Sequence, residues 1–141
     1  MSKKYTNTLL KIASNHMIIR FDDFSKAHDM TWMQASIIDF ISRNSDIEMF
    51  QRDIEKEFFL QRSTVTVLLQ RMEKKDLIYR QSSTKDARQK SVFLTQKAHK
   101  LEKQINAYMK HQQEILEANF SNAEISTFEK ILKFYSDREE H

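Results

Sequence analysis

The sequence predicts a mainly α-helical protein with one small β-hairpin wing, arranged as a winged helix-turn-helix with further helices at both ends. Three observations support this fold class. The 141 residues contain no glycine and no proline, so little interrupts a helix. Apolar residues recur at three- and four-residue steps along most of the chain. Two short β-prone runs, LIYR (77–80) and SVFLT (91–95), are separated by a polar segment.

The spacing predicts several helices before the hairpin. The first covers residues 5–27, and Thr31 with Gln34 has the pattern of a capping box that starts the next. Two short helices follow at 50–58 and 62–75, joined only by the residues FLQ. A link this short between two short helices predicts a helix-turn-helix.

Two longer helices are expected after the hairpin. One runs from about Thr95 to Asn119 with nearly heptad apolar spacing, which favours packing against another helix. The last begins at Ser121, where Glu124 completes a second capping box. We therefore expect one domain over residues 1–141, with a winged-helix region at about 31–95 and flanking helices at 1–28 and 96–141.

The composition excludes several classes of protein. Without cysteine there are no disulfides or thiolate metal sites, and without glycine there is no phosphate-cradling glycine loop or dinucleotide fingerprint. No apolar run approaches the ~20 residues of a membrane span, and the first residues lack the pattern of a signal peptide. No catalytic constellation or ligand-like histidine spacing is evident. We expect a cytoplasmic protein that is not an enzyme, with no cofactor, no metal and no membrane partner.

Charge is concentrated in the middle of the chain. The net charge is +3, but residues 61–97 hold nine Lys or Arg and three acids, a local net charge of +6. A basic centre between acidic ends favours contact with a polyanion such as double-stranded DNA. The alternative is a charged face that only contacts solvent.

The helix at 62–75 has a core face and a polar face. Val65, Leu68, Leu69 and Met72 are expected inside. An α-helix fits the major groove, where its exposed side chains contact bases and phosphates. The DNA-contacting candidates on this helix are Arg62, Ser63, Thr64, Thr66, Val67, Gln70 and Arg71. Arg62 and Arg71 are expected to contact phosphates, and the alternative for the whole set is a solvent-facing helix surface.

The polar segment between the β-prone runs, SSTKDARQKSV (82–92), lacks the glycine or asparagine that a hairpin tip usually carries. A hairpin that enters a narrow minor groove needs cations, because that groove concentrates negative potential. Lys85, Arg88 and Lys90 supply them. Asp86 is expected to pair with Arg88 and to fix the direction of its guanidinium.

The stretch STVTVLLQRMEKKDLIYRQSSTKDARQKSVFLT (63–95) resembles the signature of the MarR family of bacterial transcriptional regulators. Three features carry the resemblance. The first is the pattern STVT, LL, RMEKK and LI within residues 63–80, the second is the Asp-x-Arg of Asp86 and Arg88, and the third is the closing LT before a long helix. The resemblance implies homodimers that bind pseudo-palindromic operators. The dimerisation helices are then those at 1–28 and 96–141, and the DNA-binding region is the winged helix at about 31–95. The resemblance also implies release of DNA when a small aromatic or anionic effector binds.

Three positions depart from the family pattern. Asp76 stands where glycine is usual and must end a helix without glycine's freedom at positive φ, which aspartate tolerates better than most residues. Ala87 replaces the first of two wing arginines. Val67 stands where arginine is common, and it can contact a thymine methyl instead.

An effector site is expected near the first helix. His16 and Arg20 lie one turn apart on the apolar stripe of that helix, and Trp32 and Phe40 are candidate lining residues together with Met17 and Phe21. The alternative is that the histidine is an ordinary core or interface residue.

The resulting hypothesis is a homodimeric, ligand-responsive repressor that binds specific double-stranded DNA. The alternative is a helical dimeric protein-interaction module without specific DNA binding. A gel-shift experiment at stated salt separates the two.

Overall fold

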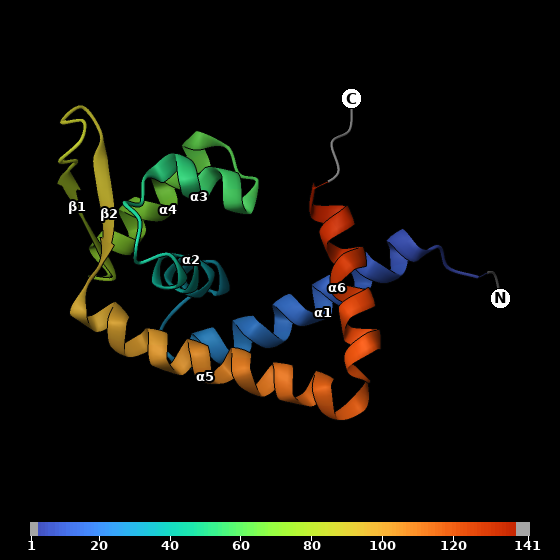
Figure 1. Cartoon of the computed structure of the whole chain (residues 1–141). Helices are drawn as coiled ribbons and strands as arrows, with labels where there is room; N and C mark the ends of the chain where they lie inside the picture. The colour runs from blue at the N-terminus through green and yellow to red at the C-terminus, as the bar shows by residue number, and fades with distance from the viewer. Residues whose placement is uncertain (1–2, 138–141) are drawn as a thin grey trace. The chain divides into compact units, whose positions relative to one another are not determined.

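The computed structural model describes residues 3–137, and these residues form helices and one β-hairpin (Figure 1). The outermost residues of the expected dimerisation helices, 1–2 and 138–141, lie outside the described part. The elements, in chain order, are α1 Thr6–Ala27, α2 Trp32–Arg43, α3 Gln51–Phe58, α4 Arg62–Lys74, β1 Ile78–Ser82, β2 Lys90–Leu94, α5 Gln96–Asn119 and α6 Asn122–Asp137. The predicted fold class, a helical protein with a hairpin wing after a helix-turn-helix, is confirmed.

The chain divides into two compact units, Met1–Lys103 and Gln104–His141. The first contains α1 to α4, the hairpin and the start of α5. The second contains the rest of α5 and α6. No helix in the described residues is long and apolar enough to cross a membrane.

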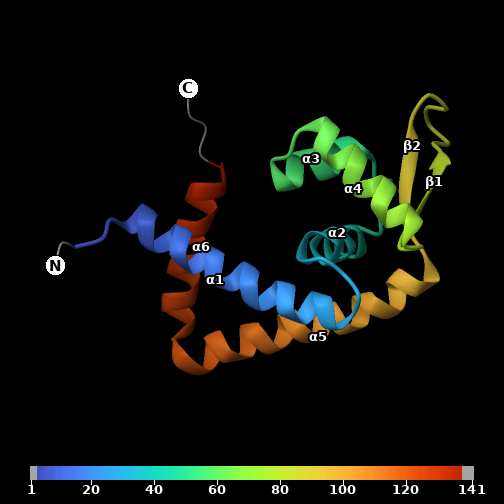
Figure 2. The ribbon, with the colours of Figure 1, turned by 180° about the vertical axis from the view of Figure 1, so that it is seen from behind.

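The core of the first unit is built around α2. Figures 1 and 2 show α2 between α1 on one side and the α3–α4 pair on the other. Ala35, Ile37 and Ile38 have no exposed surface, because they meet neighbours on both sides. Each fully buried isoleucine contributes about 1.5–3 kcal/mol. The other buried apolar residues of this core include Ile54, Val65, Leu69, Met72, Leu77, Ile78, Val92 and Ala98.

The hairpin is antiparallel and extends from the end of α4. Its register pairs Ile78 with Leu94 and Ser82 with Lys90. The opposite edge of β2 is also paired: the Val92 N–H donates to the Met49 carbonyl at 2.8 Å, and Phe50 bridges to Ser91. The wing is therefore attached to the segment that leads into α3 as well as to α4.

Both predicted capping boxes are present. The Thr31 hydroxyl accepts the Gln34 N–H at 3.1 Å, and the Gln34 side chain accepts the Thr31 N–H. Ser121 and Glu124 exchange the same pair of bonds at the start of α6. These bonds satisfy N–H groups that a helix start leaves unpaired.

Three helices of this glycine-free chain end in a left-handed residue. Asp29 after α1, Phe59 after α3 and Asp76 after α4 have φ of 57°, 51° and 59°. Each is followed by a backbone N–H that donates to a carbonyl five residues earlier, as Leu77 does to Met72 at 2.9 Å. The positive φ expected at Asp76 is confirmed. The left-handed conformation costs most free energy at Phe59, because Phe59 lacks a short polar side chain. Its side chain is 97% exposed, so burial does not offset this cost.

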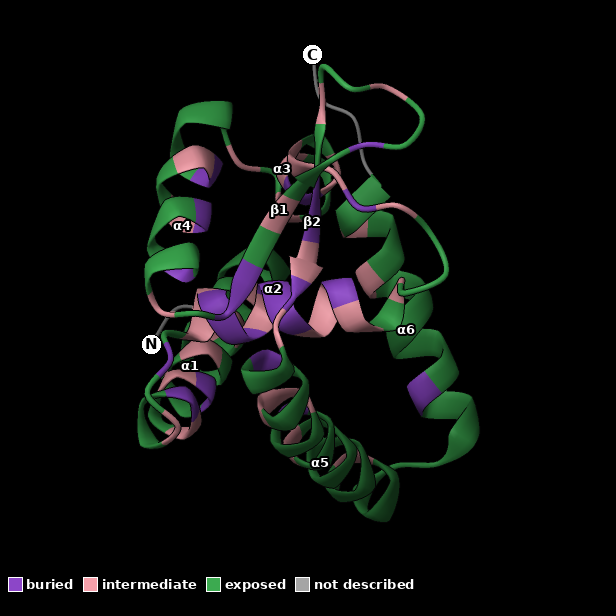
Figure 3. Cartoon of the chain, turned by 90° about the vertical axis from the view of Figure 1, so that its left-hand side faces the viewer, coloured by how far each residue is buried: buried purple, intermediate pink, exposed green. Residues whose placement is uncertain are grey.

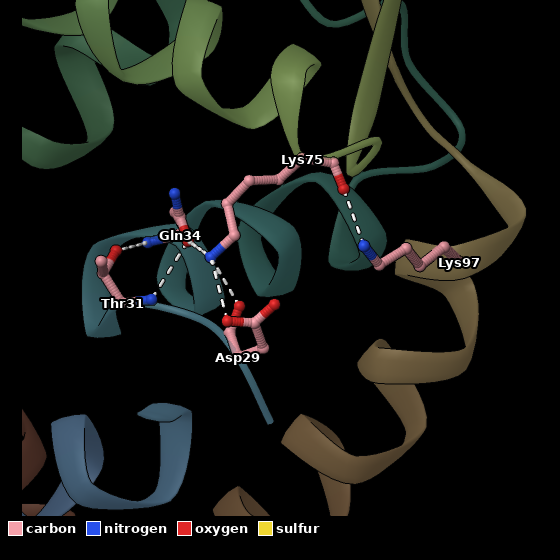
Figure 4. A network of polar contacts seen from close by, with 5 residues as sticks. All are labelled: Asp29, Thr31, Gln34, Lys75 and Lys97. Carbon is pink, nitrogen blue, oxygen red and sulfur yellow. Dashed lines mark hydrogen bonds and ion pairs between the residues drawn. The ribbon is translucent and has the colours of Figure 1, made fainter. Parts of the chain in front are cut away.

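Lys75 joins the end of α4 to the turn between α1 and α2 (Figure 4). Its ammonium donates to the Asp29 carbonyl at 2.6 Å and to Gln34 Oε1 at 3.3 Å. Its own carbonyl accepts from the Lys97 ammonium at 2.8 Å. These bonds hold together four segments that are distant in the sequence. Lys75 thus has a structural role at the junction of these segments.

The apolar stripe predicted for α1 is largely exposed within the single chain. The expectation placed His16, Met17 and Arg20 on the apolar face, yet all three are exposed in the single chain. The helix instead buries Phe21 and Ser25. The predicted stripe remains apolar but faces outward, because α1 packs on α2 mainly through its C-terminal half.

We expect Phe59→Gly to raise the free energy of unfolding by about 0.5–1 kcal/mol. Glycine removes the steric cost of the left-handed conformation, although it increases the entropy of the unfolded chain. Urea denaturation measures the change. The matched control is Phe59→Ala, which removes the exposed ring but keeps the Cβ and should leave stability nearly unchanged. An equal gain in both variants would show that the ring, and not the backbone, is the source of the cost.

Candidate nucleic-acid interface

Helix α4 presents a polar face to solvent. Val65, Leu69 and Met72 are buried against the core, and Leu68 is half-buried. The opposite side is exposed along the whole helix (Figure 3). The exposed candidates are Arg62, Ser63, Thr64, Val67, Gln70 and Arg71. The structure thus brings six of the seven predicted α4 residues onto open surface.

Thr66 differs from the other candidates on α4. Its hydroxyl donates to the Arg62 carbonyl at 2.9 Å and accepts from the Gln51 side chain at 2.8 Å. The same Gln51 amide also donates to the Arg62 carbonyl at 3.2 Å. Thr66 is half-buried, and its bonds fix the spacing between α3 and α4.

Ser83 makes a tight wing possible without glycine. Its hydroxyl accepts the backbone N–H groups of Lys85 and Asp86 at 3.1 and 3.2 Å. Its own N–H donates to the Gln89 carbonyl at 2.8 Å and closes the loop. A serine hydroxyl can thus provide a local turn in place of a left-handed glycine.

The pairing expected within the wing is present. Asp86 Oδ1 accepts from the backbone N–H of Arg88 at 3.0 Å and from its Nε at 3.1 Å. The side-chain bond from Arg88, followed by the backbone bond from the same residue, lowers the pKa of Asp86. The Arg88 side chain is still 90% exposed. The guanidinium is thus oriented by the wing but remains open to a ligand, as are Lys85 and Lys90.

A cationic hollow of about 470 Å³ separates the wing from the start of α3 and α4. Its cationic lining is formed by Arg52, Arg62, Arg80, Arg88 and Lys90, with Glu55 as the single acid in the lining. Five cations against one acid in the lining favour an anion in this hollow.

Two cations of this hollow were missed by the sequence analysis. The Arg52 guanidinium lies 4.9 Å from the centre of the Phe50 ring, which supports it in a cation–π contact. Arg80 donates through Nε to Glu73 at 3.1 Å and joins β1 to α4. Arg52 lies outside the basic segment 61–97, so its charge gave no signal in the sequence. The nearby Phe50 is the only residue close in sequence that relates to its position.

The four effector candidates lie on two helices, His16 and Arg20 on α1 and Trp32 and Phe40 on α2. His16 and Arg20 are exposed on α1. Trp32 is the first residue of α2, and its backbone N–H donates to Asp22 Oδ1 at 3.3 Å. Phe40 packs edge-on against Phe58 of α3, with ring centres 5.7 Å apart.

Within residues 3–137, no three His, Asp or Glu side chains lie close enough together to hold a metal ion.

The sequence model of the MarR family matches residues 28–89, the segment that forms the helix-turn-helix and most of the wing. The HTH-type transcriptional regulator SarZ of Staphylococcus haemolyticus is 28% identical over 88 residues, which cover 62% of this chain and 58% of SarZ. The match thus spans less than two thirds of the length of this curated relative.

Solved structures match over nearly the whole chain. The transcription regulator MarR from Oenococcus oeni PSU-1 is 49% identical, with a TM-score of 0.84 over 95% of this chain and 100% of that one. The MepR protein of S. aureus, in a structure with DNA, has the same fold, with a TM-score of 0.83 at 24% identity over 93% and 95% of the two chains. On these similarities, the protein belongs to the MarR family of transcriptional regulators.

Proposed function

We propose that this protein regulates transcription by binding specific sites on double-stranded DNA through α4 and the wing. The observation that carries the proposal is the arrangement of one open polar helix face beside one cationic hairpin in the same compact unit. A helix in the major groove and a hairpin in the adjacent minor groove fit this arrangement. The relative MepR, which shares the fold, was crystallised with DNA.

In this proposal the hollow between wing and α4 holds the DNA backbone. A sugar–phosphate strand separates every major groove from the adjacent minor groove. With α4 in one groove and Arg88 in the other, that strand passes between them, where Arg52 and Arg62 line the hollow. These two arginines contact phosphates, and Ser63, Thr64, Val67 and Gln70 reach base edges.

The protein acts as a homodimer on a pseudo-palindromic operator and works as a repressor in the cytoplasm. Residues 1–28 and 96–141 form the dimer, and residues 31–95 bind DNA. Large apolar side chains that are at least one third exposed support this proposal: Tyr5, Leu9, Met17 and Ile19 on or beside α1, Met109 and Ile115 on α5, Phe120 between α5 and α6, and Phe128, Ile131 and Phe134 on α6. A two-fold axis places the two α4 helices about one DNA turn, ~34 Å, apart.

Selection of bound duplexes from random DNA, followed by gel-shift at stated salt, tests the proposal. The expected result is two related half-sites with a fixed spacing. Failure to enrich any sequence would favour a helical dimeric protein-interaction module, the alternative that the exposed apolar helix surfaces alone would support.

We expect Gln70→Ala and Arg52→Ala to weaken DNA binding in different ways. Gln70→Ala should cost ~1–3 kcal/mol at one or two operator positions and leave the salt dependence unchanged, because it removes a base contact. Arg52→Ala should weaken binding to all duplexes and reduce the slope of log affinity against log salt by about one, because it removes a phosphate contact. Gel-shift titrations at several salt concentrations measure both effects. Lys56→Ala, an exposed cation on α3 outside the hollow, serves as the control.

We expect Phe128→Glu to produce monomers that keep their helical content. Phe128 is 46% exposed in the single chain, so a charge there harms the dimer and spares the fold. Ile105 is a poorer probe because it has no exposed surface within its own chain. Sedimentation with circular dichroism checks the prediction. A wild-type protein that is monomeric at micromolar concentration, yet binds its operator tightly, would contradict the dimer.

The repressor is also proposed to respond to a small aromatic or anionic effector near His16, Arg20, Trp32 and Phe40. A salicylate-like acid should raise the melting temperature, since a ligand at 100 times its dissociation constant adds ~2.7 kcal/mol. The increment should vanish in Arg20→Ala and persist in Lys11→Ala, which changes another exposed cation of α1. No shift with any aromatic acid at millimolar concentration would leave both residues without this role.

A further inference from the structure

A carboxylate in the segment before α3 contacts the base of the wing. The Ser91 hydroxyl on β2 donates to Glu48 Oε1, and this bond is the main reason why the pKa of Glu48 is lowered. The Ser83 hydroxyl and the Thr84 N–H act on the same carboxylate in the same direction. Ser91 and Ser83 are 1% and 6% exposed. Glu48 is therefore ionised at neutral pH and faces a nearly water-free pair of hydroxyls.

Ser83 lies where the base of the wing meets its tip. Its hydroxyl oxygen accepts the N–H groups of Lys85 and Asp86 at 3.1 and 3.2 Å. A serine hydroxyl has one proton and two acceptor lone pairs. When the proton is directed at Glu48, both lone pairs are available for the two tip N–H groups. The carboxylate thus favours the hydroxyl orientation that the turn requires.

The contacts continue from the turn to the exposed arginine. Asp86 accepts the Arg88 N–H and Nε through Oδ1 and Nη2 through Oδ2, at 3.0, 3.1 and 3.3 Å. Polar contacts therefore join Glu48 to β2 at Ser91, and join the buried Ser83 through Asp86 to the Arg88 guanidinium. Ser91 and Ser83 are both buried at the base of the wing, where both lower the pKa of Glu48.

We propose that Glu48 is a positioning residue that aims Arg88 at the minor groove, so that an acid beside the DNA surface strengthens DNA binding. The proposal rests on the proposed function, since it concerns how the wing binds DNA. Glu48 itself contacts no DNA in this scheme. Its effect passes through the turn at Ser83 and requires the Arg88 side chain.

The proposal and simple electrostatics predict opposite signs. An acid near a polyanion repels it, so neutralising Glu48 should tighten binding if only charge matters. If Glu48 aims Arg88, the neutral variant should bind more weakly. Glu48→Asp separates the two further, because it keeps the charge but withdraws the carboxylate from Ser91 and Ser83.

The experiment compares the wild-type protein with Glu48→Gln, Glu48→Asp, Arg88→Ala and the double variant Glu48→Gln/Arg88→Ala on the selected operator. Gel-shift affinities are measured with narrow-groove and wide-groove flanking sequences. Asp46→Asn is the matched control, since it removes an exposed acid from the same loop. Circular dichroism and melting temperatures verify that each variant is folded.

We expect Glu48→Gln and Glu48→Asp to bind roughly three- to tenfold more weakly than wild type, with reduced preference for narrow-groove flanks. Asp46→Asn should bind as wild type or slightly more tightly. In the Arg88→Ala background, Glu48→Gln should have no further effect, because the two residues act through one contact series.

Two results would overturn the proposal while leaving the DNA-binding function intact. One is tighter binding by Glu48→Gln, which would make Glu48 a simple repulsive charge. The other is an undiminished effect of Glu48→Gln in the Arg88→Ala background, which would make Glu48 a support for the hairpin as a whole. Wild-type protein that selects no duplex would overturn the proposed function itself, and the positioning role with it.

Discussion

The polar junction at Lys75 is the constraint that ties the ends of α1 and α4 to the starts of α2 and α5. The Lys75 ammonium donates to the Asp29 carbonyl and to the Gln34 side chain, and the Lys75 carbonyl accepts from Lys97 (Figure 4). The turn after α1, the start of α2, the end of α4 and the start of α5 are thereby held at one place. Hydrogen bonds from a charged donor are stronger than neutral ones, and this one stabilises two neighbouring left-handed turns. The junction lies at the C-terminal end of α4, the helix that carries the candidate base contacts.

In this unit, the positions of the helices and the directions of individual polar side chains depend on different kinds of contact. Buried residues of α2, α3 and α4 fix where the helices lie, and non-directional packing is sufficient for that purpose. The direction of individual side chains needs hydrogen bonds instead. Gln51 holds Thr66 between α3 and α4, Phe50 supports Arg52, and Asp86 orients Arg88. Binding surfaces of this kind combine a rigid scaffold with a few oriented polar groups.

The tight turns of this glycine-free chain are formed in two ways. Asp29 and Asp76 take up left-handed conformations that a short polar side chain tolerates, and Phe59 adopts one without that advantage. The wing tip avoids the need for such a residue because the Ser83 hydroxyl accepts two backbone N–H groups. The position of Asp76 was predictable from the family pattern, but Phe59 and Ser83 carry no comparable signal in a single sequence.

Sequence alone determined the helices, the capping boxes, the hairpin and the polar face of α4, because these depend on periodicity and on contacts between residues close in the chain. It also determined the Asp86–Arg88 pair, which spans two residues. Tertiary structure decided which residues of α1 are buried and which contacts hold Thr66. It also decided that Lys75 joins four segments and that Arg52 and Arg80 line the hollow beside the wing. It also placed Glu48 against Ser91, 43 residues later. These features depend on how helices pack and on which surfaces meet, and the spacing of residues along one chain does not encode those distances directly.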